Sequence, residues 1–561
     1  MSSTKVWVNK QVDLEVLKQF VTKGFFTPFL AQVLINKGFT SIKEAYRFLF
    51  PQLSDFGDPF LIPDMLPAVK RIYQAAISNE TIGIYGDSDA DGIIGSFVLY
   101  DFLVSIGCKV EWLIPSKEKE GYGFHAKFLP YFKQKGVSLL ITVDVGISAA
   151  DTVNEAKALG IDVIVTDHHE VVEKPDTIVV SGKLTSKSSP FYHLCGAGVA
   201  FTLIRALRKF FYEQGFFRGD NIPQIRKYLE LVGLATLADM VPLLGENRTI
   251  TFYGFRDLSS PSFLATKLLI ENSRLNGTLS EEDLLYRVIP KINAAGRMGT
   301  PELVFQFLKE NEETKAKELL TKIEGINQRR QELELEILSS LENLAKREIE
   351  RYPFIFLAAE NLPKGLLGLI ANRLKNQYQV PAIVVSIENG VGFASGRAPE
   401  GLNLFKAVSK CEDLLIQYGG HKHALGFQVS LNNIEALKSR LADEIKKLTL
   451  VSKPEKEIVY VEAEVELAEL LHPENLKALT YLHPYGEAHL PPNILIRNFE
   501  VKERFLLKDK HSKFVLKKGL NEIIAIWFNQ VVEDERIRLV LGQPYVNTYR
   551  NTLEIKVVDV R

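Results

Sequence analysis

The chain has 561 residues, which at roughly 150 residues per domain predicts about four domains. Hydrophobic residues make up 46% and charged residues 24%, so a largely disordered chain is excluded. The formal net charge of −1 means that any binding of nucleic acid needs a local basic surface. Three scattered cysteines fit neither a disulfide framework nor a zinc pair, which favours the cytoplasm. We expect no signal peptide and no membrane helix, because no apolar run reaches ~18 residues.

The predicted elements begin with short helices over residues 1–75. From about residue 80, short apolar runs alternate with helical stretches, which predicts βαβ units and a parallel sheet that is covered on both faces. We expect this α/β domain to span residues 76–302. Its strands are predicted at 81–86, 109–115, 138–146 and 162–167.

The second half of the chain has three further predicted parts. The charged segment 303–352 has apolar residues at helical spacing, which predicts a long helix that connects two domains. A smaller α/β domain is expected at 353–449, followed by a polar linker at 450–457. Alternating strands in 456–561 predict a small β-barrel.

Three carboxylates follow the first predicted strand, in the sequence Gly86-Asp-Ser-Asp-Ala-Asp-Gly92. Asp87, Asp89 and Asp91 repel one another when they are ionised and close together, and a divalent cation relieves that repulsion. An EF-hand loop is excluded because Val98 stands where its last ligand belongs. Taken alone, the motif fits a solvated acidic turn equally well.

Three more motifs place carboxylates and imidazoles after apolar stretches: Asp144, the run Asp167-His168-His169, and Asp239. Each alone also fits a structural role, as a helix cap, a pair of loop histidines or a carboxylate paired with a base. Functional groups gather at the carboxyl ends of parallel strands, so the set together is stronger evidence than each member. Several carboxylates with histidine are what a two-metal site for phosphoryl hydrolysis requires. The mixed donors favour Mn²⁺ or a similar ion over Ca²⁺.

The second α/β domain carries Ala394-Ser-Gly-Arg397 and, further along, Tyr418-Gly-Gly-His421. A glycine pair lets the backbone approach a ligand closely, and Arg397 and His421 carry donors that suit a phosphate. A tight turn with incidental charge is the alternative. We favour substrate binding.

The order of these motifs resembles the DHH phosphoesterase superfamily and, within it, the RecJ single-strand-specific exonucleases. The four phosphoesterase motifs stand at 86–92, 141–147, 166–169 and 234–243. Further matching segments are 194–201, 289–298, 368–373, 419–421 and 484–492. The resemblance implies a DHH phosphoesterase domain with a parallel sheet, a long connecting helix, a smaller α/β DHH-associated domain and a C-terminal OB-fold.

The resemblance also implies roles for single residues around two Mn²⁺ or Mg²⁺ ions. Asp89 and Asp91 would each ligate one ion, Asp144 would bridge both, His168 would bind the second ion and Asp239 the first. Asp87 would support the loop, and His169 would face the scissile phosphate. The implied substrate-binding residues are Asn293, Arg297, Arg373, Ser395, Arg397, Gly419, Gly420 and His421.

Two departures from the family pattern concern the substrate side. Lys291 stands where the family usually has arginine, and the Trp-His pair before Gly365 is absent. Lys keeps the positive charge but loses a bidentate donor. These changes leave the preferred substrate open.

The C-terminal region offers the basic surface that a near-neutral chain needs. Residues 502–518 hold seven basic and two acidic side chains with interleaved phenylalanines, which suits single-stranded nucleic acid. A solvated lysine-rich hairpin is the alternative. The candidate DNA contacts are Lys502, Arg504, Lys508, Lys510 and Phe514.

The resemblance implies a 5′-to-3′ exonuclease that acts on single-stranded DNA in recombination and repair and releases 5′ mononucleotides. It further implies single-strand-binding protein and a RecQ-type helicase as partners. One alternative is a phosphoesterase for short oligonucleotides or cyclic dinucleotides, although the N-terminal extension and the barrel argue against it. Another is a non-catalytic DNA-binding scaffold, which the five intact metal-ligand positions disfavour. Near-neutral charge and the lack of a heptad run suggest a monomer.

Overall fold

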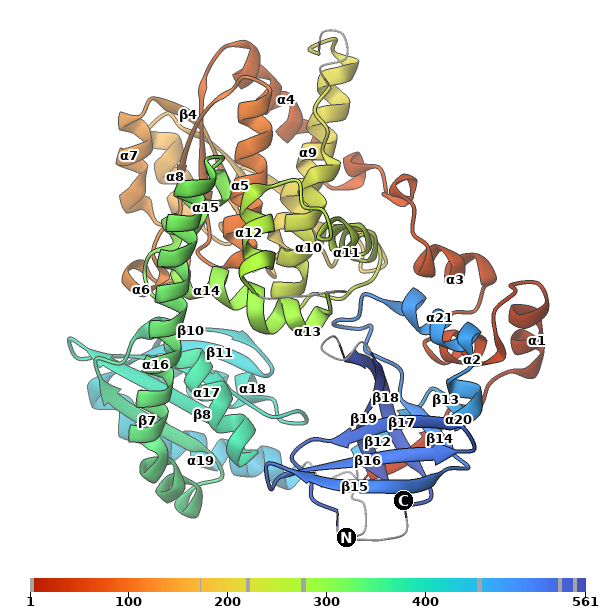
Figure 1. The fold of residues 1–561 in the computed structure, drawn as a ribbon. Helices are drawn as coiled ribbons and strands as arrows, with labels where there is room; N and C mark the ends of the chain where they lie inside the picture. The colour runs from red at the N-terminus through yellow and green to blue at the C-terminus, as the bar shows by residue number, and fades with distance from the viewer. Residues whose placement is uncertain are drawn as a thin grey trace.

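The computed structural model describes residues 5–171, 173–217, 222–273, 279–451, 457–532, 537–547 and 552–561. An N-terminal helical segment, two α/β domains and a C-terminal barrel follow one another along the chain (Figure 1). Residues 452–456 of the predicted linker lie outside the described residues. No helix among the described residues has the length and apolar character that a membrane crossing requires.

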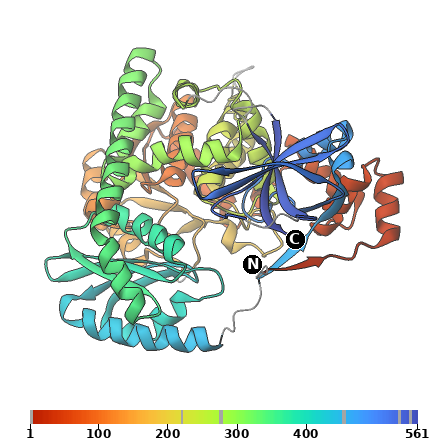
Figure 2. The same ribbon diagram turned by 60° about the horizontal axis from the view of Figure 1, so that its bottom comes forward.

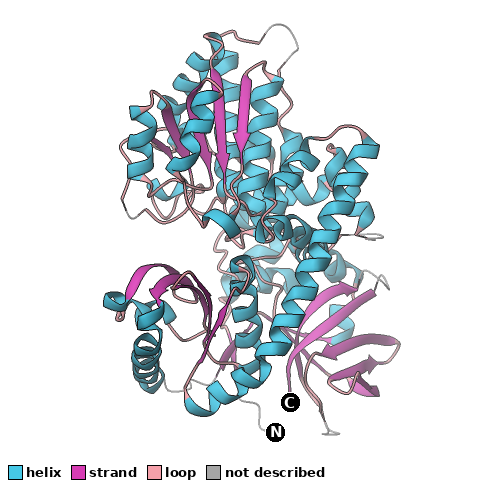
Figure 3. Cartoon of the chain, turned by 90° about the vertical axis from the view of Figure 1, so that its left-hand side faces the viewer, coloured by secondary structure: helices cyan, strands magenta, loops and turns pink. Residues whose placement is uncertain are grey.

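The large α/β domain contains a five-stranded, all-parallel sheet with the order β3-β2-β4-β5-β6 (Figure 3). Its strands are β2 (Thr81–Gly86), β3 (Lys109–Leu113), β4 (Val137–Val143), β5 (Asp162–Thr166) and β6 (Ile178–Val180). Alternate residues of β4 face two different cores: Ile141 and Val143 face one, and Leu140 faces the other. The predicted parallel sheet with two covered faces is confirmed.

Helices form both cores of this domain. One face of the sheet packs against α4 (Met65–Ile77), α5 (Ala90–Ser105), α9 (Gly196–Glu213) and α10 (Leu229–Ala238). The other packs against α7 (Leu129–Gln134) and α8 (Ala150–Ala158). Further helices are α6 (Lys117–Glu120), α11 (Glu246–Asp257), α12 (Leu264–Asn272), α13 (Glu281–Asp283) and α14 (Ile289–Arg297). Helix α4 begins before the predicted domain boundary at residue 76 and packs into the α/β core.

The N-terminal segment lies beside the barrel, although the two are at opposite ends of the chain (Figure 2). Strand β1 (Lys5–Asn9) pairs in parallel with β12 (Glu457–Val461). Helices α1 (Leu14–Thr22), α2 (Pro28–Asn36) and α3 (Ile42–Leu49) share one hydrophobic core with the barrel. We predicted only helices here; β1 forms because a distant strand completes its hydrogen bonds, which local spacing does not reveal.

The predicted connecting helix is two helices, α15 (Pro301–Lys309) and α16 (Glu313–Arg351). The break occurs where the Glu310 carboxylate accepts hydrogen bonds from the amides of Asn311 and Glu312, at 2.9 and 2.8 Å. Such local bonds compete with those of a helix. The 39-residue helix α16 runs from the large domain to the smaller one (Figure 1).

The smaller α/β domain has a five-stranded mixed sheet with the order β10-β11-β9-β8-β7, in which only the β7–β8 pair is parallel. Its strands are β7 (Ile355–Glu360), β8 (Ala382–Glu388), β9 (Val391–Arg397), β10 (Leu415–His421) and β11 (Ala424–Ser430). Its helices are α17 (Lys364–Tyr378), α18 (Leu404–Ser409) and α19 (Ile434–Val451).

The C-terminal domain has a seven-stranded sheet with the order β13-β14-β18-β19-β17-β16-β15. The strands are β13 (Ala463–Glu466), β14 (Ile494–Arg497), β15 (Glu500–Leu507), β16 (His511–Lys518), β17 (Asn521–Trp527), β18 (Val540–Asn547) and β19 (Thr552–Val560). Helices α20 (Leu467–Leu470) and α21 (Pro473–Leu482) connect β13 to β14. The predicted strand-rich C-terminal domain is confirmed.

Candidate active site

The first group of site residues comes from the turn between β2 and α5. Asp89 is the N-cap of α5, and its Oδ1 accepts hydrogen bonds from the amides of Asp91 and Gly92, at 3.1 and 3.2 Å. A carboxylate is favourable there because the helix N-terminus is positive. Glycine is required at 92, since a Cβ would lie 2.5 Å from the Asp87 carbonyl oxygen. The turn therefore gathers Asp87, Asp89 and Asp91 at one strand end.

The second group comes from the end of β4 and the beginning of α9. Asp144 follows β4 in a left-handed conformation, with φ at 64°. The Asp91 carboxylate accepts hydrogen bonds from Gly196 N at 2.6 Å and Ala197 N at 2.9 Å, which fixes it on the N-terminus of α9. A Cβ at Gly196 would lie 2.6 Å from the Asp144 Cβ, so glycine lets the helix approach this carboxylate.

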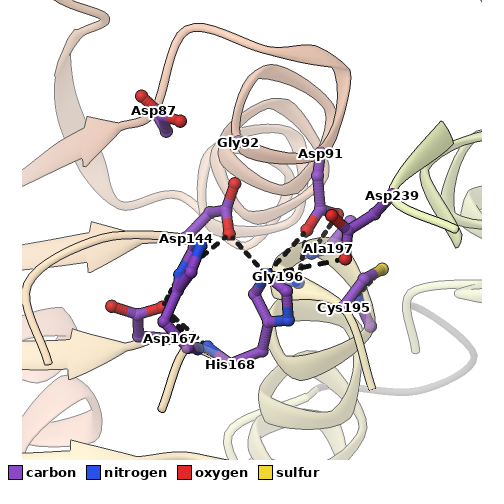
Figure 4. Close-up of polar contacts among 12 residues, drawn as sticks. Asp87, Asp91, Gly92, Asp144, Asp167, His168, Cys195, Gly196, Ala197 and Asp239 are labelled. Carbon is purple, nitrogen blue, oxygen red and sulfur yellow. Dashed lines mark hydrogen bonds and ion pairs between the residues drawn. The ribbon is translucent and has the colours of Figure 1, made fainter. Parts of the chain in front are cut away.

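His168 lies among three carboxylates (Figure 4). Its Nε2 is 3.1 Å from Asp144 Oδ1, 3.6 Å from Asp239 Oδ2 and 3.8 Å from Asp91 Oδ2. Asp239 is the residue at which helix α10 ends, so a fourth chain segment completes this cluster. The imidazole nitrogen therefore lies close to three carboxylates that come from distant parts of the sequence.

Donor atoms of the seven predicted catalytic residues form three groups, within each of which all the atoms lie within 4.8 Å of one another. Asp144 and His168 each belong to two of the groups, and of the two only the carboxylate has two oxygens with which to contact two ions. We predicted that Asp87 only supports the loop, but one of its carboxylate oxygens lies within 4.8 Å of a carboxylate oxygen of Asp89 and of Asp144. The groups are Asp144 with His168 and His169, Asp91 with His168 and Asp239, and Asp87 with Asp89 and Asp144.

The electrostatics of this cluster fit divalent cations. Asp144 Oδ1 and Asp239 Oδ2 are buried and accept no hydrogen bond from the described residues. Burial and the neighbouring carboxylates raise the pKa of Asp91 to about 7 and that of Asp239 to about 9, and they raise the pKa of Asp144 as well. Burial and the charge of His169 lower the pKa of His168 to about 4, so its imidazole is neutral and free to ligate. A buried set of carboxylates and a neutral imidazole is a donor set for Mn²⁺ or Mg²⁺.

Asp167 orients His169, a role that we did not predict. Asp167 Oδ1 is 2.7 Å from His169 Nδ1, and its Oδ2 accepts a hydrogen bond from Ile147 N at 3.0 Å. Burial lowers the pKa of His169, but the hydrogen bond and charge of Asp167 outweigh it, so the pKa is raised. The hydroxyl oxygen of Tyr122 also lies 3.1 Å from His169 Nδ1. The only sequence signal for Asp167 is its place directly before the two histidines.

Lys117 is a second site residue that we did not predict. Its Nζ is 3.5 Å from Asp87 Oδ2. Desolvation opposes the charge, but Asp87, Asp89 and Asp144 raise the pKa of Lys117, so the ammonium group persists beside the carboxylates. In the sequence this residue belongs to the run Lys-Glu-Lys-Glu, which is also typical of a solvated loop.

The predicted substrate residues of the large domain lie on α14. Asn293 Oδ1 accepts a hydrogen bond from Ala90 N at 2.8 Å, so this side chain holds the β2–α5 turn in place. Arg297 donates through Nη1 to Gly365 O, at 3.3 Å, and therefore reaches the smaller domain. Lys291 is buried and its Nζ is 3.0 Å from Glu324 Oε1, so this departure from the family pattern serves the fold.

The predicted substrate residues of the smaller domain lie on neighbouring strands. Arg397 on β9 and His421 on β10 are both register partners of Ala424 on β11, so they flank it at one end of the sheet. Arg397 donates to Ser395 Oγ at 3.0 Å and to Gly396 O at 2.8 Å. Burial and the charge of Arg297 lower the pKa of Arg397.

The other three predicted substrate residues have different surroundings. Arg373 forms an ion pair with the buried Glu334, at 2.9 Å, which neutralises part of its charge. Gly419 and Gly420 are exposed on β10. At Gly420 φ is 133° and a Cβ would lie 2.5 Å from the Leu425 Cα, so only glycine fits this position.

Some of the predicted DNA contacts of the barrel are exposed, and others already interact with neighbouring side chains. Lys508 and Lys510 are exposed between β15 and β16. Lys502 forms an ion pair with Glu522 at 3.0 Å, and Arg504 lies 5.9 Å from the centre of the Phe514 ring. The prediction for Phe514 is wrong: its side chain is 1% exposed, because strand alternation turns it into the core.

Comparison with sequence families matches three segments of the chain. They are the "DHH family, N-terminal domain" at residues 81–236, the "DHHA1 domain" at 351–447 and the "RecJ OB domain" at 461–559. These segments correspond to the two α/β domains and the barrel.

Proteins named RecJ are similar to nearly the whole length of the chain. The single-stranded-DNA-specific exonuclease RecJ of Bacillus subtilis is 32% identical over 567 residues, covering 98% of this chain and 70% of its own length. The protein of that name from Escherichia coli is 26% identical, covering 95% of both chains. The crystal structure of Thermus thermophilus RecJ with Mn²⁺ superposes with a TM-score of 0.83 at 27% identity, covering 100% of this chain and 80% of the other. The structure of that protein with Mg²⁺ gives a TM-score of 0.75 at 25% identity, covering 99% and 78%.

Proposed function

Because this chain belongs to the RecJ family, we propose that it is a metal-dependent exonuclease that degrades single-stranded DNA from the 5′ end, releases 5′ mononucleotides and acts in DNA recombination and repair. The observation that carries the proposal is the buried cluster around His168, in which Asp91, Asp144 and Asp239 lie within 3.8 Å of its Nε2.

Two Mn²⁺ or Mg²⁺ ions would be held by the ligands that the sequence predicts. When bound, such ions supply Lewis acidity and lower the pKa of water. Asp144 belongs to two donor groups and would be the carboxylate that bridges the ions. Asp87 is a further candidate ligand beside Asp89, because their donor atoms lie within the same group. The proposed ligands are Asp89, Asp91, Asp144, His168 and Asp239.

His169 and Lys117 act on the scissile phosphate. Asp167 engages Nδ1 of His169, so Nε2, which lies 3.4 Å from the Tyr122 hydroxyl, is the nitrogen that would donate a hydrogen bond to a phosphate oxygen. The raised pKa of His169 favours its charged form, which strengthens that hydrogen bond. The Lys117 ammonium group adds positive charge on the Asp87 side of the site.

The smaller domain holds the DNA strand by its phosphates. Arg397 is preorganised by its hydrogen bonds to Ser395 and Gly396, and it presents a planar guanidinium group, which suits a phosphate. His421 flanks the same position, and Arg297 reaches the smaller domain from the large one through its hydrogen bond to Gly365 O. Contacts of this kind do not read bases, so we expect little sequence preference.

The test is hydrolysis of a long single strand that is labelled in turn at its 5′ and 3′ ends. Release of labelled mononucleotides from the 5′ end with Mn²⁺, and none with EDTA, would support both the activity and its direction. A duplex of the same sequence is the control for strand specificity. Release from the 3′ end first would contradict the proposed direction, and an intact single strand would contradict the activity.

We also propose that the barrel binds the trailing strand through Lys508 and Lys510. We further propose that the protein is a monomer and that it works in the cytoplasm with single-strand-binding protein and a RecQ-type helicase. The exposed lysines and the match to the RecJ OB domain support strand binding. Light scattering on the purified protein tests the monomer. Faster hydrolysis when either partner is added would support the partnership.

A further inference from the structure

Helix α17 of the smaller domain receives its N-terminal cap from the large domain. Its first two amides donate to Glu118: Lys364 N to Oε1 over 3.1 Å, and Gly365 N to Oε2 over 2.6 Å. The residue in the N-cap position is Pro363, which supplies no capping side chain. Glu118 thus does from a distant part of the chain what a neighbouring Ser or Asp does in most helices.

The two domains approach each other closely at this cap. A Cβ at Gly365 would lie 2.2 Å from the Arg297 carbonyl oxygen, so only glycine permits the contact. Arg297 also donates to Gly365 O. Gly299, just beyond α14, lies against α6, because a Cβ there would be 3.3 Å from Ser116 Oγ. Helices α6, α14 and α17 therefore meet at Glu118.

Both sides of this junction lead to the active site. On α6, Lys117 precedes Glu118 and reaches Asp87. On α17, a Cβ at Gly368 would lie 2.8 Å from Arg397 Nη2, so the helix packs directly on the phosphate-binding guanidinium group. The position of α17 relative to α6 therefore sets the distance between the carboxylates and Arg397.

We propose that Glu118 is a positioning residue that holds the phosphate-binding side of the smaller domain at its working distance from the metal-binding side of the large one. The inference rests on the proposed nuclease function. Glu118 is not among the proposed metal or substrate ligands and acts through α17. Its negative charge is favourable at a helix N-terminus, and charged acceptors form the stronger kind of hydrogen bond.

Removal of the carboxylate takes away two of the hydrogen bonds that hold the beginning of α17 to the large domain, and it leaves the one from Arg297 to Gly365 O. A displacement of about 1 Å in a substrate-positioning group costs up to about a hundredfold in rate. We therefore expect Glu118→Ala to lower kcat/KM for single-stranded DNA by about tenfold to a hundredfold. The affinity for Mn²⁺ should stay within about twofold, because the carboxylate cluster lies within the large domain.

The experiment compares four full-length proteins: the wild type, Glu118→Ala, Glu118→Gln and Glu120→Ala. Glu120 is the matched control, because it lies on the same short helix but its carboxylate pairs with Lys127 of its own domain. Glutamine keeps one oxygen acceptor of the two, so Glu118→Gln should fall between alanine and the wild type. For each protein, kcat and KM are measured on a long single strand with Mn²⁺, and Mn²⁺ affinity is measured by calorimetry.

The inference is supported when Glu118→Ala loses kcat/KM, Glu118→Gln loses less, Glu120→Ala matches the wild type and Mn²⁺ affinity is unchanged. It is overturned when Glu118→Ala degrades DNA as fast as the wild type, or when its Mn²⁺ affinity falls as much as its kcat/KM, which indicates general damage to the domain. A wild type that leaves single strands intact overturns the proposed function, and this inference with it.

Discussion

The two α/β domains both present functional groups from a five-stranded sheet, but they do so differently. In the large domain every strand is parallel and both faces are covered, so the strand-end side chains Asp87, Asp144 and His168 converge in a buried place. In the smaller domain the functional strands are antiparallel, and Arg397 and His421 stand on either side of Ala424 near the surface.

The charges of the two regions differ in the same way. The large domain collects carboxylates, and Asp144 Oδ1 and Asp239 Oδ2 accept no hydrogen bond from the described residues, so we expect the ionised cluster to need cations. In the smaller domain Arg397 donates through Nη1 to Ser395 and Gly396, and Arg373 pairs with Glu334. The difference predicts that metal binding stabilises the first region, whereas the arginines of the second already have protein partners before the substrate arrives.

The largest effect should come from Asp144→Asn. We expect kcat/KM on single-stranded DNA to fall by about a thousandfold or more, because the bridging carboxylate is lost. The metal-free variant should be more stable than the wild type by about 1–2 kcal/mol, because one buried negative charge is removed from a repelling cluster. Thermal unfolding in EDTA measures this, and a variant that melts below the wild type would contradict the comparison.

Arg397→Ala should lower kcat/KM on single-stranded DNA by about tenfold to a hundredfold, the value of a charged hydrogen bond to phosphate. The loss should appear mainly in KM, with Mn²⁺ affinity unchanged, because the metal side is independent of this residue. Arg440→Ala is the matched control, since Arg440 pairs with Asp413 on the surface of the same domain. Equal losses in both variants would argue against a phosphate contact.

The stability of the metal-free protein should depend on pH. The folded-state pKa values of Asp91, about 7, and Asp239, about 9, exceed the ordinary value of 3.8. At a pH between 3.8 and these raised values, the folded chain therefore binds more protons than the unfolded chain. Stability should therefore fall as pH rises from 6 to 8, by up to about 1.4 kcal/mol per pH unit for each group.

The matching measurement is calorimetric unfolding at pH 6, 7 and 8, with EDTA and with Mn²⁺. Mn²⁺ ligands must lose their protons, so the rise in melting temperature on adding Mn²⁺ should grow with pH. Asp144→Asn should show a flatter dependence in EDTA. If Mn²⁺ raised the melting temperature equally at all three pH values, the cluster would already be ionised without metal.

The smallest effect should come from the barrel. The double variant Lys508→Ala, Lys510→Ala should weaken binding of a long single strand by a few-fold and reduce the salt dependence of log K by about 1.4, that is ~0.7 for each phosphate contact. Lys502→Ala is the control, since Glu522 already pairs with that charge. An unchanged salt dependence would place the DNA elsewhere on the barrel.

Sequence patterns were sufficient where the information is local or repeats along the chain. Buried parallel strands appear as short apolar runs, and the carboxyl ends of such strands share one edge, so Asp144 and His168 could be expected to meet. Two predictions failed at the level of single elements. Phe514 faces the core because its position in the strand alternation decides its direction, and the helix break at 310–312 depends on one carboxylate.

Other features depend on partners that are remote in sequence. Lys117 belongs to the site only because α6 lies over Asp87, and Asp167 orients His169 only through the geometry of its loop. Strand β1 needs β12 to complete its hydrogen bonds. No spacing rule within a short window contains such information.

The shared core of helices α1–α3 and the barrel has a consequence for synthesis. Residues such as Phe29 and Leu49 pack with Ile494 and Ile555, so this core closes only after the barrel has left the ribosome. Translation adds roughly 5–20 residues per second, so helices α1–α3 wait for tens of seconds. During this time the two α/β domains that separate them from the barrel in the sequence are translated and fold. During that interval the apolar faces of helices α1–α3 are available to chaperones, and these helices are made long before they reach their final surroundings.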